Sequence, residues 1–139
     1  MIENLAQFFS DEKRIYLNEV QYHVIEDGED AEEYELICND NLEVSLKENE
    51  GVQILLTRTL KIDPRDLFEL SVSFGAELLF SENKDQINWK AIKLAEEFRN
   101  NGDFITSILA SRVSLLVSQI TSSHGQTPLV TPPTLGKKE

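Results

Sequence analysis

Cysteine is nearly absent from this sequence, because Cys38 is the only one among 139 residues. An internal disulfide therefore cannot form, and the cysteine content does not indicate an oxidising compartment. Residues 1–7 lack the basic segment and apolar stretch of a secretion signal. No run of about 18 consecutive apolar residues occurs either, which argues against a membrane-spanning helix. We therefore expect a cytoplasmic protein without membrane insertion.

Basic residues are also few, since 13 Lys and Arg stand against 25 Asp and Glu, a net charge of −12. A surface that met nucleic-acid phosphates would have to overcome long-range repulsion, so we expect no nucleic-acid partner. Ten of the acids lie between Ile15 and Leu46, a stretch without Lys or Arg, and they are densest from Glu26 to Glu33. This dense part is either a solvated acidic loop or a docking surface for a basic partner.

Groups for covalent chemistry are scarce as well. His23 and His124 are about a hundred residues apart, and neither has a local partner with metal-ligand spacing. The chain has no GxSxG, GxGxxG or GxxxxGK[ST] motif. Cys38 stands beside Asn39 and Asp40 without a nearby base, which is typical of an inert strand cysteine. We expect no enzyme, with no catalytic residue, no metal site and no cofactor.

Four stretches show the pattern of β-strands, with Ile, Tyr, Val or alternating apolar residues. They are residues 14–25, 34–47, 52–62 and 67–80. Turn-forming residues at 48–51 and at Asp63-Pro64 separate the later stretches, which predicts an antiparallel order. Tyr16 and Tyr22 should share one face of the first strand, and Gly75 predicts a bulge in the last.

Two helices are expected after the strands. Asn88 can cap a helix over residues 89–100 that Gly102 ends, and Asp103 can cap a longer helix over residues 104–123. Three of the four prolines follow Gly125, which predicts an extended or disordered tail. We therefore divide the chain into an N-terminal segment (1–13), one domain (14–124) and a proline-containing tail (125–139). The fold class is α+β.

The longer helix carries a stripe of small hydroxyl residues opposite its apolar residues. The stripe comprises Ser107, Ser111, Ser114, Ser118 and Thr121. Arg112 is the only Lys or Arg in this helix, although solvent-facing helices usually carry many charges. The stripe is either buried within its own domain or packed against another subunit, and small side chains favour the close approach of a second backbone.

The order of elements and several motifs resemble the SecB family of protein-export chaperones. Residues 14–22 (RIYLNEVQY) resemble the family's first strand, and residues 67–76 (LFELSVSFGA) its fourth strand. Residues 111–133 (SRVSLLVSQITSSHGQTPLVTPP) resemble its long helix, glycine turn and proline-closed aliphatic segment. The resemblance covers about residues 10 to 135 and is most specific at this C-terminal part.

The resemblance implies a four-stranded antiparallel sheet with long helices packed on one face. It also implies a homo-oligomer, a dimer of dimers, with Ser107, Ser111, Ser114 and Ser118 at the subunit interface. SecB-like chaperones hold unfolded polypeptides or preproteins in hydrophobic grooves and deliver them to the SecA motor. For the groove we name the aromatic residues Tyr34, Phe68, Phe74 and Trp89, although simple core positions would also account for them.

The sequence departs from the family in two ways, and both bear on a role in protein export more than on the binding of unfolded polypeptides. Glu19 matches an acid that docks SecA, but His23 and Ser71 occupy positions where two further acids are expected. The chain ends at Glu139 without the family's second helix after the prolines. The alternatives are a chaperone dedicated to one partner, such as an antitoxin, and an adaptor that holds a folded partner.

Overall fold

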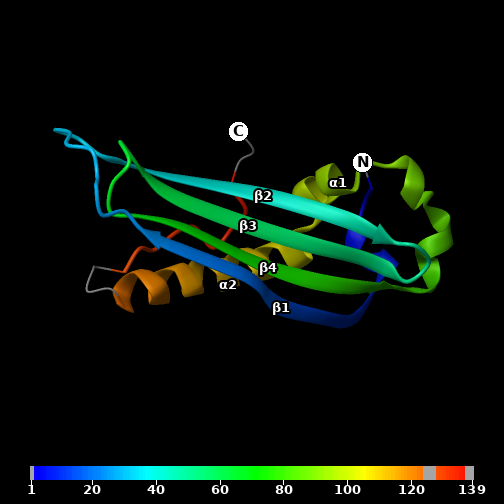
Figure 1. Ribbon diagram of the computed structural model, residues 1–139. Helices are drawn as coiled ribbons and strands as arrows, with labels where there is room; N and C mark the ends of the chain where they lie inside the picture. Colours follow the sequence, from blue (N-terminus) through cyan, green and yellow to red (C-terminus); the bar gives the residue numbers. More distant parts are fainter. Residues whose placement is uncertain (1, 124–127, 137–139) are drawn as a thin grey trace.

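In the computed structural model, which describes residues 2–123 and 128–136, four long strands form one antiparallel sheet. The strands are β1 (Phe9–Val24), β2 (Glu35–Lys47), β3 (Gly51–Asp63) and β4 (Phe68–Phe80). Their order across the sheet is β1-β4-β3-β2, so β1 and β2 are its two edges (Figure 1). β3 and β4 are buried at alternate positions, as expected where one face of a sheet packs on a core. The four predicted strands are confirmed.

Two helices, α1 (Leu94–Asn101) and α2 (Asp103–Ser123), cover one face of this sheet (Figure 1). α2 packs on β4 and β3, and α1 packs on β2. The α2 side chains that face the sheet are fully buried and include Ile105, Leu109, Val113 and Val117. We call this face the helix side of the sheet and the opposite face its outer side. The predicted α+β class, with helices on one face of a four-stranded antiparallel sheet, is confirmed.

α2 is long and apolar enough to cross a membrane by length and composition alone. The sequence contained no unbroken apolar run of that length, because serines and threonines interrupt the pattern. Packing of one α2 face on the sheet accounts for many of the apolar residues. The expectation of no membrane insertion stays a prediction.

An aromatic cluster closes one end of the sheet and explains two shifted element boundaries. β1 begins at Phe9 rather than at residue 14, because Phe9 pairs with Phe80 across the sheet. The two rings stack, with their centroids 5.4 Å apart. The ring centroids of Trp89 and Phe80 are 5.0 Å apart. Trp89 Nε1 also donates a hydrogen bond to Lys84 O at 2.8 Å. These two interactions of Trp89 hold residues 89–91 in a short 3₁₀ turn, so α1 begins only at Leu94. The side chain of Asn88, which was expected to cap the helix, makes no capping hydrogen bond.

The described part of the chain also contains three 3₁₀ turns: η1 (Leu5–Phe8), η2 (Glu82–Gln86) and η3 (Trp89–Ala91). η1 buries Leu5 and Phe8 in the core, and β1 begins inside the segment 1–13 that was set apart in the sequence. The division into 1–13, 14–124 and 125–139 stays a prediction. Gly125 and the predicted helix stop lie outside the described residues.

A shift of register in β1 separates two tyrosines that were expected on one face. The pairing with β4 shifts between Leu17 and Glu19, which adds a residue to β1 and reverses its alternation. The Tyr16 ring lies on the outer side, where a Cβ atom on Gly75 would come within 2.4 Å of Tyr16 Cζ. Tyr22 instead stacks on the buried Phe68. The predicted bulge at Gly75 is wrong, because this glycine gives room to Tyr16 and the irregularity lies in β1.

Candidate functional site

A buried ion pair joins β2 and β3 on the helix side of the sheet. Asp40 and Arg58 occupy directly opposite positions of the ladder. Arg58 Nε and Nη2 donate to the two carboxylate oxygens of Asp40 at 2.7 and 2.8 Å. Their side chains are 1% and 2% exposed. Burial opposes the charge of Arg58, but the hydrogen bond and negative charge of Asp40 outweigh it and raise the pKa of Arg58. Arg58 is therefore charged at every ordinary pH.

The C-terminal segment 128–136, which we call the tail, passes across the helix side of the sheet (Figure 1). There it supplies the other partners of Arg58. Arg58 Nη1 donates to Thr131 Oγ1 at 2.8 Å and to Pro132 O at 2.7 Å. Arg58 Nη2 also donates to Thr134 O at 3.0 Å. A guanidinium has five N–H groups, so two of them serve Asp40 and three serve the tail.

The end of the tail is tied to both β2 and α1. Gly136 N donates to Asp40 Oδ2 at 2.7 Å, and Arg99 Nη1 of α1 donates to Gly136 O at 2.8 Å. Within the tail Thr131 is buried, whereas Val130 is 85% exposed. The tail is therefore held largely by hydrogen bonds from buried or partly buried donors and acceptors.

Two serines of the predicted interface stripe contact this tail. Ser114 Oγ donates to Thr131 O at 2.6 Å, and Ser111 Oγ donates to Pro133 O at 3.5 Å. Ser107 is exposed and donates only within its own helix, to Asp103 O. Ser118 is half-buried. Part of the stripe is thus covered by the chain itself, and its role as a subunit interface stays a prediction.

Sequence reasoning did not single out Arg58, Asp40 or Arg99. A signal was present: Arg58 continues the apolar series Val52, Ile54, Leu56 of β3, at the alternation that faces the core. Asp40 interrupts the corresponding series of β2 in the same way. Two opposite charges in core-facing positions of neighbouring strands indicate a buried pair.

The helix side of β2 is partly open on both sides of the tail. Leu36 is 40% exposed, and Cys38 is exposed as well. Beyond Asp40, a hollow of about 420 Å³ lies between β2 and α1 and is lined by Leu42, Arg99 and neighbouring residues. Leu36, Cys38, Leu42 and this hollow together form what we call the β2 surface. It offers a long, partly apolar face beside an edge strand.

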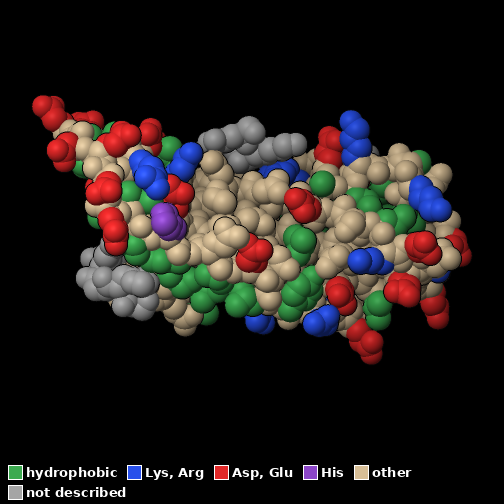
Figure 2. Space-filling model, in the orientation of Figure 1, with side chains coloured by type: hydrophobic (Ala, Val, Ile, Leu, Met, Phe, Trp, Pro, Cys, Tyr) green, Lys and Arg blue, Asp and Glu red, His purple; other side chains and the backbone are tan. Residues whose placement is uncertain are grey.

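The β1 edge carries a second apolar strip on the helix side. Val20 and Val24 pair with the buried Val72 and Phe68, so they face the same way as those residues. Leu17 and Val24 are 52% and 51% exposed. Figure 2 shows hydrophobic side chains gathered along this edge of the molecule. Exposed apolar side chains on an unpaired edge strand are suited to contact with another polypeptide.

The four aromatic residues predicted to line a groove do not come together. Tyr34 is exposed in the loop just before β2, where its hydroxyl donates to Glu29 O at 2.7 Å. Phe68 and Trp89 are buried in the core at opposite ends of the sheet, and Phe74 is half-buried between them. Phe68 and Trp89 offer almost no surface to a ligand, because Tyr22 stacks on the Phe68 ring and the aromatic cluster around Phe80 covers the Trp89 ring. The participation of Tyr34 and Phe74 in binding stays a prediction.

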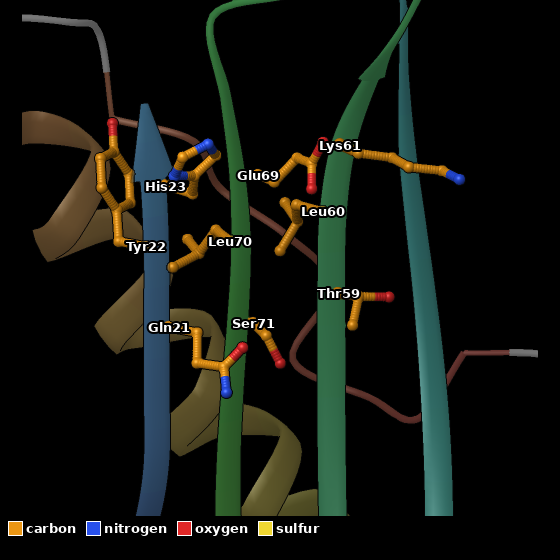
Figure 3. Close-up of a pocket in the computed structure, with 9 residues that line it drawn as sticks. All are labelled: Gln21, Tyr22, His23, Thr59, Leu60, Lys61, Glu69, Leu70 and Ser71. Carbon is orange, nitrogen blue, oxygen red and sulfur yellow. The ribbon is translucent and has the colours of Figure 1, made fainter. Parts of the chain in front are cut away.

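The outer side of the sheet is mostly polar around the residues considered for SecA docking. Glu19 accepts a hydrogen bond from Gln21 Nε2. A shallow hollow of about 220 Å³ next to it includes His23, Glu69 and Lys61 (Figure 3). Glu69 lies directly opposite both His23 and Lys61 in the ladders. Acidic and basic side chains therefore alternate here, and the described residues form no acidic patch around Glu19.

The dense acidic segment is exposed between β1 and β2. Figure 2 shows its Asp and Glu side chains gathered at one end of the molecule. Glu29 N donates to Arg65 O at 2.8 Å, which ties the loop to the turn between β3 and β4. This exposure fits the interpretation of the segment as a solvated acidic loop. Its use as a docking surface for a basic partner stays a prediction.

The described residues offer little for covalent chemistry. Among them, no group of three or more His, Cys, Asp or Glu could hold a metal ion. Burial raises the pKa of the Cys38 thiol, Arg58 lowers it and Asp40 raises it further, so the neutral, less nucleophilic thiol is favoured. His23 is exposed, and His124 lies outside the described residues. That the chain is not an enzyme stays a prediction.

Comparison with known proteins identifies the fold. No protein-family model matches the chain, and no curated protein matches it in sequence. Among solved structures it is similar to the Mycobacterium tuberculosis SecB-like chaperone Rv1957, solved with a ChAD peptide from the HigA1 antitoxin. The TM-score is 0.65 at 16% identity, over 92% of this chain and 88% of that chain. The chain therefore has a SecB-like fold, as the sequence resemblance predicted.

Proposed function

We propose that this chain is a SecB-like holdase, which binds unfolded polypeptides or preproteins by hydrophobic contact and uses no cofactor. The observation that carries the proposal is the partly exposed, partly apolar β2 surface at the edge of a SecB-like sheet. Burial of apolar area contributes about 25 cal/mol per Å². Each such contact is weak, but contacts along an extended client add up over its length.

The proposal includes a homo-oligomer, a dimer of dimers. Its support is the β1 edge, where Leu17, Val20 and Val24 are open, and the exposed Leu115 on α2. A long edge strand also presents unpaired backbone groups. Another copy of the chain would cover both features.

A second candidate function is a chaperone dedicated to one partner, such as an antitoxin. The structurally similar mycobacterial protein was solved with an antitoxin peptide, which favours this reading. The two candidates differ in client range. A dedicated chaperone protects one protein, whereas a general holdase also protects unrelated ones.

The test is aggregation of a chemically unfolded, unrelated protein followed by light scattering without ATP. We expect a several-fold excess of the chain to delay aggregation, because the β2 surface covers apolar segments of the client. Leu36→Ser should weaken this delay. Leu79→Ser is the matched control, since Leu79 is similarly exposed, at 46% against 40%, but lies off the β2 surface.

Three outcomes distinguish a general holdase from a dedicated chaperone or an adaptor. No delay of aggregation by the unaltered protein would contradict the holdase and favour a dedicated chaperone or adaptor. An equal effect of Leu36→Ser and Leu79→Ser would place client binding away from β2. Binding of an apolar fluorescent dye checks independently for an open surface, which an adaptor closed around a folded partner would lack.

A further inference from the structure

Arg58 presents three N–H donors that the sheet does not satisfy. Asp40 accepts from Nε and from one Nη2 N–H, which leaves both N–H groups of Nη1 and the second one of Nη2. A buried charged donor without an acceptor is strongly unfavourable. Any chain segment that covers Arg58 on the helix side must therefore supply acceptors for these three donors.

The tail meets this requirement mainly through its backbone. Two of the three acceptors are main-chain carbonyls, those of Pro132 and Thr134, and only the Thr131 hydroxyl belongs to a side chain. The tail bends at Pro133 and Thr134, which brings both carbonyls to Arg58. Carbonyls are present in every polypeptide, so another segment that crosses the sheet can offer Arg58 main-chain acceptors whatever its sequence.

The tail is held by apolar contact as well as by hydrogen bonds. Pro132, Pro133 and Thr134 are exposed, while Thr131 is buried and Leu129 and Leu135 are partly buried against the core. Another chain that takes the place of residues 131–136 must therefore supply acceptors for Arg58 and an apolar side chain in place of Leu135.

The tail also lies across the path of a client on the β2 surface. Leu36 and Cys38 are open on one side of the crossing, and the hollow beside Leu42 and Arg99 is open on the other. A segment that follows β2 from Leu36 to this hollow passes over Asp40. It then meets the tail where Gly136 N donates to Asp40.

We propose that Arg58, Asp40 and Arg99 form a binding site for an extended polypeptide backbone, which residues 131–136 of the tail fill in the absence of client. An extended client segment takes this site when it binds, and the tail leaves. The tail is thus an internal competitor that weakens client binding. This inference rests on the proposed holdase function.

The test uses the full chain and a pair of matched variants. Thr131→Val removes the hydroxyl that accepts from Arg58 and keeps the shape of the side chain. Thr134→Val is the control, because the Thr134 side chain is exposed and only its backbone carbonyl meets Arg58. The probe is a fluorescently labelled, reduced and carboxymethylated protein that stays unfolded in buffer, and binding is measured by anisotropy.

We expect Thr131→Val to bind this probe several-fold more tightly than the unaltered protein, and Thr134→Val to bind it equally. Saturation of the unaltered protein with the probe should also speed hydrogen exchange at Gly136 N, which donates to Asp40. Equal affinity of Thr131→Val together with unchanged protection of Gly136 would overturn this inference and leave the holdase intact. No binding by any form would overturn both.

Discussion

Arg58 uses all five of its guanidinium N–H groups inside the fold, on Asp40 and on the tail. Lysine could not replace it, because an ammonium has three donors and cannot bind a carboxylate in the planar, two-pronged geometry. Without Arg58, the Asp40 carboxylate would stay buried and charged, with the neutral backbone N–H of Gly136 donating to it. One side chain thus connects two strands to the C-terminal tail.

Replacement of Arg58 by Met should lower the free energy of unfolding by about 3–5 kcal/mol, because it leaves a buried charge without its partner. Urea denaturation measures this change. Arg65→Met is the matched control, since Arg65 pairs with Glu69 at an exposed site, where such a pair contributes about 0.2–1 kcal/mol. The double variant Arg58→Met with Asp40→Leu should recover much of the loss. Equal stability of the two single variants would contradict the importance of the buried pair.

The tail and α2 are linked elements, because two serines of the predicted interface stripe donate to tail carbonyls. The small side chains of this stripe allow a close approach of the tail backbone, as they would allow that of a second subunit. A substitution at Ser114 would therefore disturb the tail as well as any interface. Ser107 is a cleaner position, since it is exposed and bonds only within its helix.

Ser107→Glu should dissociate the oligomer without unfolding the subunit. In a lone subunit the glutamate meets water, but in a subunit interface it would be a buried, unpaired charge that costs several kcal/mol. Light scattering at micromolar concentration measures the mass. Ser45→Glu places the same charge at an exposed position of β2 and should leave the mass unchanged. A monomeric unaltered protein, or an oligomer that survives Ser107→Glu, would contradict an interface at this stripe.

Most elements could be predicted because their signals are local. Apolar and alternating patterns identified all four strands, and the apolar stretch that follows the Asp103 cap identified α2. The early start of β1 could not be predicted, because it depends on the pairing of Phe9 with Phe80, far away in sequence. The late start of α1 depends in the same way on the position of Trp89 in the aromatic cluster.

The site was predicted less well, because burial depends on the assembled layers. Aromatic content alone could not distinguish Phe68 and Trp89, which are core residues, from the exposed Tyr34. The extra residue in β1 placed Tyr16 and Tyr22 on opposite faces. The contact of the tail with Arg58 joins residues more than 70 positions apart, and no local pattern of the sequence indicates it.

Charge is distributed unevenly over the whole molecule. The loop between β1 and β2, at one end of the sheet, carries six acids and no Lys or Arg, which is half of the net charge of −12 (Figure 2). The outer side around Glu19 carries Lys61 and His23 as well as Glu69. The loop can attract a basic partner over a distance, but it is exposed and does not fix the geometry of a docked complex.

We therefore expect binding to a SecA motor to be weak and strongly dependent on salt. Each exposed charge pair contributes about 0.2–1 kcal/mol, and the attraction of the loop is screened within about 8 Å at physiological salt. Binding of unfolded clients should change far less with salt, since apolar burial supplies most of it. Calorimetry at two salt concentrations compares the two partners directly.

The double variant His23→Asp with Ser71→Glu tests whether His23 and Ser71 occupy the positions of the family's SecA-docking acids. It adds acids at the two outer positions where docking members of the SecB family are expected to carry them, next to Glu19. SecA binding should tighten several-fold at low salt, while client binding should not change. Ser45→Glu with Asn41→Asp adds the same number of acids elsewhere on the outer side and serves as the control. Tight, salt-insensitive binding of SecA by the unaltered chain would contradict the matching and would favour a general role in export.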